Sequence, residues 1–582
     1  MENSAKFNTL KLKMVNIPGK CYEYDAPAGP DVRMLRHLLL LTVMLMACAL
    51  LQAQPLHGQR SFTHQDTLRG TLSEQRTWWD VLKYDITVQP DYDTKTIIGK
   101  NIISYSIVTR QHPDTMQIDL QEPMVIDSLF SGAVKTTYTR NGNAFFVFIP
   151  KQGNATTGVL TIWYHGKPRE AVRPPWDGGW IWKKDEKGRP WMSVACQGLG
   201  ASVWFPCKDH QSDEPEQGAV LNIIVPDSLT AVGNGRLKEK KPYTNGASIW
   251  TWVVVNPINN YDIIPYIGKY ANWQETFNGE KGKLLCSYWV LDYNLEKAKE
   301  QFKQAPLMLK CFEYWFGPYP FYEDSYKLVE APHLGMEHQS ATAYGNKYQN
   351  GYLGRDLSAS GWGLKWDFII IHESGHEWFG NNITTKDVAD MWVHESFANY
   401  SEALYTECQF GKKAGQDYAI GSRKMTRNDI PIIGPYGVNQ EGSGDMYYKG
   451  GNMLHTIRQV INDDEKFRQL LRGLNQTFYH KTVTSQEIEG YISIESKIDF
   501  SKVFDQYLRT TNIPVLEYQL SDKSIRFRWT NCLPGFNLPL KINAGEEKWI
   551  RPTEAWQTVE VAKPADFTVD RNFFVNVKKL IE

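Results

Sequence analysis

The chain has 582 residues, of which 42% are hydrophobic and 22% are charged. It is long enough for about three or four domains and too rich in apolar side chains for a disordered protein. Because 64 Lys and Arg residues are balanced by 65 Asp and Glu residues, composition gives no electrostatic case for binding nucleic acid or an anionic membrane surface.

The first fifty residues are not expected to belong to the fold. Arg33 and Arg36 precede a largely apolar run of about 14 residues, 38–51, and Gln52-Ala53-Gln54 follows it. A basic start, a short apolar run and a small-residue exit are typical of a secretory signal peptide, whereas a membrane-spanning helix needs about 20 apolar residues. We predict a signal peptide at 34–54 and a mis-called extension at 1–33, with Met34 as the true start.

The mature protein is therefore expected to be exported to the periplasm or the medium, without a stable membrane span. A lipoprotein acylated at Cys48 is the less favoured alternative, because the apolar residues that follow Cys48 favour ordinary cleavage. Export permits disulfides among the cysteines beyond the signal, but their spacing names no pairing. The oligomeric state is equally open.

Three regions follow the signal. Residues 61–270 contain short β-branched and aromatic segments separated by turn signals such as Asn141-Gly142, which predicts an N-terminal all-β domain. Helical patterns dominate 271–511 from about residue 295 onwards, and short strand patterns return in 512–582. The predicted fold class is multidomain α+β, with a helical middle domain and a small C-terminal β domain.

The segment His372-Glu373-Ser-Gly-His376 carries the sharpest chemical signal. On a helix the two histidines leave the same face one turn apart, and two imidazoles so placed can bind one Zn²⁺. Glu373 would lie beside the open coordination position, where it can act as a general base. The competing interpretation is a pair of histidines in a core helix.

A catalytic zinc needs a third protein ligand. Glu395 lies on a second helical stretch, nineteen residues after His376, which leaves room for the first helix to end and the chain to return. His394 is the competing ligand, although its side chain would point about 100° away from that of Glu395. Asp390 is either a hydrogen-bond partner of a ligand histidine or a helix cap.

Together these segments resemble the gluzincin aminopeptidases, the family of aminopeptidase N and leukotriene hydrolase. H-E-x-x-H, eighteen residues and Glu is that family's zinc pattern. Four further segments are similar in order and spacing to family motifs; they are Trp204-Phe-Pro-Cys-Lys-Asp209, Gly335-Met-Glu-His338, Trp392-Val-His-Glu-Ser-Phe-Ala398 and Tyr447-Tyr-Lys-Gly450. The resemblance spans about 61–582 and implies a thermolysin-like catalytic domain at 271–511.

The resemblance also implies a role for each matching residue. One Zn²⁺ per chain would be held by His372, His376 and Glu395. Glu373 would be the general base, and Tyr447 would donate to the oxyanion, with Tyr448 as the alternative because the two tyrosines are adjacent. The substrate-binding residues would be Glu337 and Gln197, which bind the free α-ammonium, and Gly335 and Met336, whose backbone lies against the peptide.

Three positions depart from the family pattern: His338 and His394 replace asparagines, and Ser396 replaces a glycine. None removes a ligand, the base or the amine anchor. The predicted function is an exported zinc aminopeptidase acting on peptides with a free N-terminus. The alternatives are a zinc endopeptidase, or a catalytically silent relative that binds peptide or glycan through the Trp-rich segment 174–191.

Overall fold

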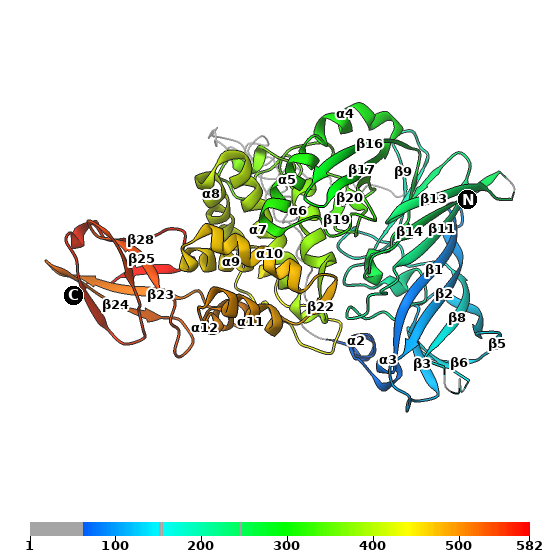
Figure 1. Ribbon diagram of the computed structural model, residues 1–582, viewed down its shortest axis with the longest axis horizontal. Coiled ribbons are helices and arrows are strands. Elements are labelled where there is room, and N and C mark those ends of the chain that lie inside the picture. Colours follow the sequence, from blue (N-terminus) through cyan, green and yellow to red (C-terminus); the bar gives the residue numbers. More distant parts are fainter. Residues whose placement is uncertain (1–61, 151–152, 154, 245, 582) are drawn as a thin grey trace, which may run out of the picture. The chain divides into compact units, whose positions relative to one another are not determined.

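The computed structural model describes residues 62–150, 153, 155–244 and 246–581 (Figure 1). The predicted extension, the signal peptide and Cys48 lie outside the described residues, so these remain predictions. Within the described ranges, no helix is both long and apolar enough to cross a membrane.

The described chain begins with two short helices, α2 (His64–Gly70) and α3 (Glu74–Thr77). The strand prediction from residue 61 is therefore wrong for this stretch. Thr63 and Asp66 form a capping box, in which each side chain accepts a hydrogen bond from the other residue's backbone. Such reciprocal capping stabilises the first turn of a helix.

Sheets dominate the region that follows, as predicted (Figure 1). In β1 the buried and less buried side chains largely alternate, because one face of the strand packs on the core. The largest sheet has, in order, β13 (Arg236–Pro242), β14 (Ala247–Val254), β11 (Ala219–Pro226), β1 (Trp79–Asp91), β2 (Thr96–Ile107), β8 (Thr157–Gly166), β4 (Val125–Ser131) and β5 (Val134–Lys135).

Two smaller sheets complete this region. One has the order β12 (Thr230–Val232), β15 (Tyr266–Gly268), β10 (Pro190–Ala195) and β9 (Gly179–Lys184); the other has β3 (Thr115–Asp119), β7 (Ala144–Phe148) and β6 (Tyr138–Asn141). The Trp-rich segment forms the β9–β10 hairpin, and its Trp180 and Trp182 are 0% and 6% exposed. Because these two rings belong to the core, they cannot serve as a stacking surface.

The middle region starts with a mixed sheet that the sequence analysis did not predict. Its order is β16 (Tyr270–Gly279), β17 (Gly282–Leu291), β18 (Tyr326–Glu330), β20 (Thr342–Tyr344) and β19 (Gly335–Met336). The strands between 326 and 344 are short and entirely buried, so they lack the alternating pattern of a half-exposed strand. Strand β19 forms one edge of this sheet.

Helices make up most of the rest of the middle region. They are α4 (Leu295–Gln301), α5 (Gln304–Phe316), α6 (Phe368–Gly375), α7 (Trp392–Phe410), α8 (Lys412–Ser422), α9 (Tyr448–Ile461), α10 (Asp464–Thr477), α11 (Ser485–Ser496) and α12 (Ser501–Arg509). A disulfide between Cys311 and Cys408 joins α5 to α7. This supplies a pairing that the sequence left open.

Residues beyond α12 form two small sheets. The first has the order β27 (Gln557–Glu560), β24 (Ser524–Thr530), β23 (Val515–Leu520) and β29 (Asn576–Lys579). The second has the order β26 (Glu547–Ile550), β25 (Leu540–Asn543) and β28 (Thr568–Val569). The predicted multidomain α+β fold class is confirmed, whereas the domain boundaries stay predictions.

Candidate active site

Helix α6 carries His372 and Glu373, and its sequence explains its position. Asp367 caps the helix by accepting hydrogen bonds from the backbone amides of Ile369 and Ile370, at 3.1 and 3.4 Å. All residues of α6 are buried, as expected from the apolar run before His372. The buried N-cap fixes where the helix begins and therefore which face presents the histidines.

Helix α6 ends at Gly375 with His376 as its C-cap, and the backbone departs from helical angles at Phe379 and Gly380. The His376 ring Nδ1 lies 3.0 Å from the carbonyl of Phe379, so Nδ1 donates, and in the neutral imidazole Nε2 then has the lone pair. The turn passes through Gly380 at φ 135°, where a side chain would be strained. A Cβ at that position would also lie 3.2 Å from His376 Nδ1, so glycine lets the chain close around the ring.

His372 is oriented by a carboxylate that the sequence analysis missed. Its Nδ1 donates to Glu402 at 2.8 Å, and Glu402 is also held by the hydroxyl of Tyr418 at 2.6 Å. The alternative partner Asp390 is wrong, because its carboxylate accepts from Ser485 and Tyr436. A signal was available: Glu402 follows Glu395 by seven residues, about two turns along the same face of α7.

Glu395 meets the two histidines at one point. Its Oε2 lies 3.6 Å from His372 Nε2 and 3.4 Å from His376 Nε2. All three side chains are buried, and their ligand atoms form a group that could hold a metal ion. The competing ligand His394 faces elsewhere: its Nε2 accepts a hydrogen bond from the Thr385 amide at 2.9 Å.

The predicted base Glu373 lies at the edge of this cluster. Its Oε1 is buried and has no hydrogen-bond partner among the described residues. Burial raises the pKa of Glu373 to about 7, although His372 and His376 act in the opposite direction. Gly335, on edge strand β19, faces the same atom, and a Cβ there would lie 2.7 Å from Glu373 Oε1. Glycine therefore leaves space beside the base.

The predicted amine anchor Glu337 follows β19 and is buried, which raises its pKa. Gln197 and Tyr261 both donate to its Oε1, Tyr261 at 3.1 Å, and Tyr261 is another residue that the sequence analysis missed. One carboxylate oxygen of Glu337 lies within 4.8 Å of ligand atoms of Glu373 and His376. The anchor is thus close enough to serve the first residue of a peptide.

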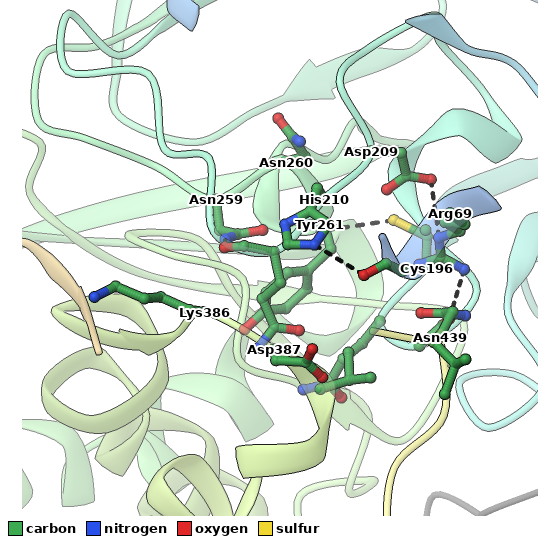
Figure 2. A pocket seen from close by; sticks show the side chains of 17 residues that line it. Arg69, Cys196, Asp209, His210, Asn259, Asn260, Tyr261, Lys386, Asp387 and Asn439 are labelled. Atoms are coloured by element: carbon green, nitrogen blue, oxygen red, sulfur yellow. Dashed lines mark hydrogen bonds and ion pairs between the residues drawn. The ribbon is translucent and has the colours of Figure 1, made fainter. Parts of the chain in front are cut away.

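A pocket adjoins this anchor, and Figure 2 shows the side chains that line it. Gln197 and Tyr261 form part of its wall, together with charged and amide side chains such as Asp387 and Asn439. Met336, by contrast, is 3% exposed and belongs to the hydrophobic core, so only its backbone remains a candidate for substrate contact.

Tyr447 lies at the start of α9, beside the cluster. Its ring is 5.9 Å from that of His372. Burial and the nearby Glu395 carboxylate raise its pKa well above the ordinary value, so the hydroxyl keeps its proton. The alternative, Tyr448, has a buried hydroxyl without a hydrogen-bond partner among the described residues. Its position beside Glu395 and His372 favours Tyr447 as the donor.

Comparison with known families decides the classification. Residues 81–261 match the model of the peptidase M1 N-terminal domain, and residues 300–507 match the peptidase family M1 domain. Together the two matches span more than half of the chain. The chain belongs to the M1 peptidase family. The resemblance to gluzincins drawn from the motifs is thereby confirmed.

Curated relatives of this M1 family member are distant. It is 23% identical to leukotriene A-4 hydrolase of Xenopus laevis over 65% of this chain and 60% of that protein. It is also 23% identical to aminopeptidase B of Mus musculus, over 64% of this chain and 56% of that protein. The chain thus spans less than two thirds of the length of these relatives.

Solved structures show the same fold. An M1 zinc metallopeptidase from Deinococcus radiodurans has a TM-score of 0.63 at 20% identity, covering 75% of this chain and 95% of that one. A structure of that metallopeptidase bound to a Tyr-Ser-Ala substrate has a TM-score of 0.61. Both agree with the fold predicted from the motifs.

Proposed function

We propose that this M1 family member is an exported, zinc-dependent aminopeptidase. The observation that carries the proposal is the short distance between the candidate amine anchor and the candidate metal position. A buried carboxylate suited to a free α-ammonium, Glu337, lies within 4.8 Å of Glu373 and His376, which flank the candidate metal position. A peptide whose ammonium occupies this anchor would present its first carbonyl to the metal cluster.

The residues fit zinc by geometry and by donor chemistry. Tetrahedral zinc with ligands at about 2.0–2.1 Å holds them roughly 3.3 Å apart, close to the 3.4 and 3.6 Å between Glu395 Oε2 and the two Nε2 atoms. Both imidazoles donate through Nδ1, so both Nε2 lone pairs are free to bind. His₂Glu is a ligand set of hydrolytic zinc sites.

Bound zinc would supply a Lewis acid that polarises the scissile carbonyl and lowers the pKa of water. The chain's own residues would transfer the protons and stabilise the developing negative charge. Glu373 would accept a proton from the attacking water and deliver it to the leaving amine nitrogen. The Tyr447 hydroxyl would donate to the oxygen on which negative charge develops.

The anchor explains why single residues would be removed from the N-terminus. An ammonium that enters a buried position needs an anionic partner, and Glu337 supplies one. Gln197 and Tyr261 donate to its Oε1 and would hold the carboxylate in place for the ammonium. A chain without a free N-terminus would leave the Glu337 charge uncompensated, which disfavours binding.

Export is supported by the signal-like segment 34–54 and by the disulfide Cys311–Cys408. Disulfides persist in oxidising compartments such as the periplasm and the extracellular medium. The N-terminal sequence of the mature protein, read from the cell envelope and the medium, tests this part. A start at Met1 or Met34 in cytosol alone would contradict it.

The central test compares the wild type with Glu373→Gln and Glu337→Ala on aminoacyl-anilides and an N-acetylated control. We expect the wild type to cleave only the free amines, Glu373→Gln to keep its zinc but lose at least about 100-fold in kcat, and Glu337→Ala to lose cleavage of the anilides. Cleavage of the acetylated control by the wild type would favour the endopeptidase alternative. Full activity of Glu373→Gln would refute the assigned chemistry.

A further inference from the structure

The turn that carries Gln197 is held in place by three other segments of the chain. The turn closes on itself through a hydrogen bond from the Gly200 amide to the Cys196 carbonyl at 2.6 Å. The carbonyls of Gly198 and Leu199 then accept hydrogen bonds from three side chains. These are Arg69 of α2, Gln121 after β3, and Asn439 from the loop 434–442.

Arg69 makes the most of these contacts. Its Nη1 donates to both carbonyls, to that of Gly198 at 2.8 Å. Its Nε lies 3.3 Å from the buried carboxylate of Asp209, and the arginine side chain is 20% exposed. Figure 2 shows Arg69 between Asp209 and Asn439 at the wall of the pocket.

Gly200 makes the close approach of Arg69 possible. Its φ is 101°, a conformation that favours glycine. A Cβ at that position would lie 2.1 Å from the Asp209 carboxylate and 2.6 Å from the guanidinium carbon of Arg69. The backbone therefore reaches the Arg69–Asp209 pair directly, with no side chain between them.

The contacts of α2 extend to the catalytic region as well. The Asn439 amide donates to the Asp66 carbonyl at 3.0 Å, and the Thr71 hydroxyl donates to the Gly437 carbonyl at 2.8 Å. No residue of α2 is fully buried. The helix thus contributes little apolar burial, and its polar contacts connect the Gln197 turn to the loop 434–442 that precedes Tyr447.

We propose that Arg69 is a positioning residue for the substrate's α-ammonium. Arg69 fixes the peptide groups on either side of Leu199, which keeps Gln197 Nε2 on Glu337 Oε1 and keeps the carboxylate directed at the ammonium. The inference rests on the proposed aminopeptidase function and adds a residue outside the motifs that define the site. It assigns α2 a role in recognising the free N-terminus.

The test measures binding of two matched inhibitors to the zinc-loaded protein. Alanine hydroxamate carries the α-amine, and propanohydroxamate lacks it but has the same metal-binding group. Because Arg69 donates as a charged group to both carbonyls of the turn, we expect Arg69→Ala to weaken binding of the amine-bearing inhibitor about tenfold. Affinity for propanohydroxamate should change less than about twofold, since a general loss of structure would weaken both.

Two further variants sharpen this test. Arg189→Ala removes an arginine of similar exposure, 25%, that pairs with Asp185 and Asp292 instead, and it should leave both affinities unchanged. If Arg69 acts through Gln197, adding Arg69→Ala to Gln197→Ala should produce no further loss. Additive losses, or an equal effect on both inhibitors, would overturn the proposal.

If the Arg69→Ala variant does not fold, Arg69→Lys replaces it in the inhibitor test. An ammonium keeps the charge beside Asp209 but lacks the planar fork of the guanidinium, so we expect a loss of about threefold for alanine hydroxamate alone. Failure of this inference can be distinguished from failure of the proposed function. A wild type that does not cleave aminoacyl-anilides refutes the function, whereas an active wild type whose inhibitor ratio is unaffected by either Arg69 variant refutes only this inference.

Discussion

At the scale of single residues, Ser396 connects the candidate metal cluster to Tyr447, the proposed oxyanion donor. It stands next to Glu395 on α7, and its hydroxyl donates to the Met446 carbonyl at 2.6 Å. Met446 directly precedes Tyr447. The absence of a side chain at Gly450 makes room, because a Cβ there would lie 1.8 Å from Ser396 Oγ. The replacement of the family's glycine by serine therefore adds a hydrogen bond between α7 and the residue that precedes Tyr447.

Removing this hydrogen bond should affect catalysis more than substrate binding. A buried neutral hydrogen bond contributes about 0.5–1.5 kcal/mol, so Ser396→Ala should lower kcat roughly two- to tenfold. KM and zinc content should stay at the wild-type values, since the substrate anchor and ligands are untouched. Steady-state kinetics and metal analysis check this.

Ser401→Ala is a matched control for that variant. Ser401 is also buried on α7, but its hydroxyl donates to Ala398 within the helix. An equal fall in kcat in both variants would contradict a specific role of Ser396, as would a changed KM with unchanged kcat.

At the scale of elements, helix α7 carries a candidate metal ligand near one end and a disulfide near the other. Its N-terminal turn carries Glu395, and Cys408 near its C-terminal end is joined to Cys311 of α5. The bridge closes a loop with a sequence separation of 97. Long closed loops restrict the unfolded chain most, which is why such a bridge stabilises the fold.

Loss of the bridge should therefore reduce stability while activity persists. Cys311→Ser/Cys408→Ser should lower the free energy of unfolding by about 2–4 kcal/mol. At 25 °C kcat should be nearly unchanged, because Glu395 lies more than three helical turns from Cys408. Thermal unfolding with and without reductant checks this, and reductant should not destabilise the double variant further. Reductant-insensitive unfolding of the wild type would show that the bridge is absent.

At the scale of the whole molecule, distant parts of the chain build one site. Gln197 and Tyr261 come from the β-rich region, and Glu337 comes from beside an edge strand. The candidate metal ligands come from α6, its C-cap and α7. The hydrophobic core is continuous across this junction, since it contains both Trp204 and Met336. Binding at the site should consequently stabilise more than one region.

Removal of the metal tests this expectation. Zinc that is present at about 1,000 times its Kd stabilises the folded state by about 4 kcal/mol, so a chelator should abolish activity and lower the first unfolding temperature by roughly 5–10 °C. Added zinc should restore both. Glu395→Gln should show a smaller chelator-dependent shift, because one ligand is lost. A chelator that removes activity without any change in unfolding would contradict coupling between the metal and the fold.

Much of the site could be predicted because its signals are local. His372 and His376 are one helical turn apart, and Glu373 lies beside them, so spacing alone predicts a shared face. Short strands with clear turns also predicted the β-rich region. Strands β18, β19 and β20 of the mixed sheet were not predicted because they are buried throughout and show no alternation. Helix α2 was not predicted because its seven residues include no buried side chain and so show no hydrophobic period.

Contacts across long stretches of sequence were beyond prediction. Tyr261 reaches Glu337, and Arg69 reaches Gly198, through backbone geometry that no spacing encodes. Asp390, which the sequence offered as a partner for a ligand histidine, binds Ser485 instead.

The sequence by itself determined the family of this protein and its candidate metal site, which consists of the helical His372–His376 motif and Glu395 as the third ligand. The reason is that ligand type and helical period are properties of neighbouring residues. Only the tertiary structure decided which side chains orient those groups, with Glu402 on His372 and with Gln197 and Tyr261 on Glu337. Such pairs form where packed elements bring remote residues within about 3 Å, and packing depends on the whole chain.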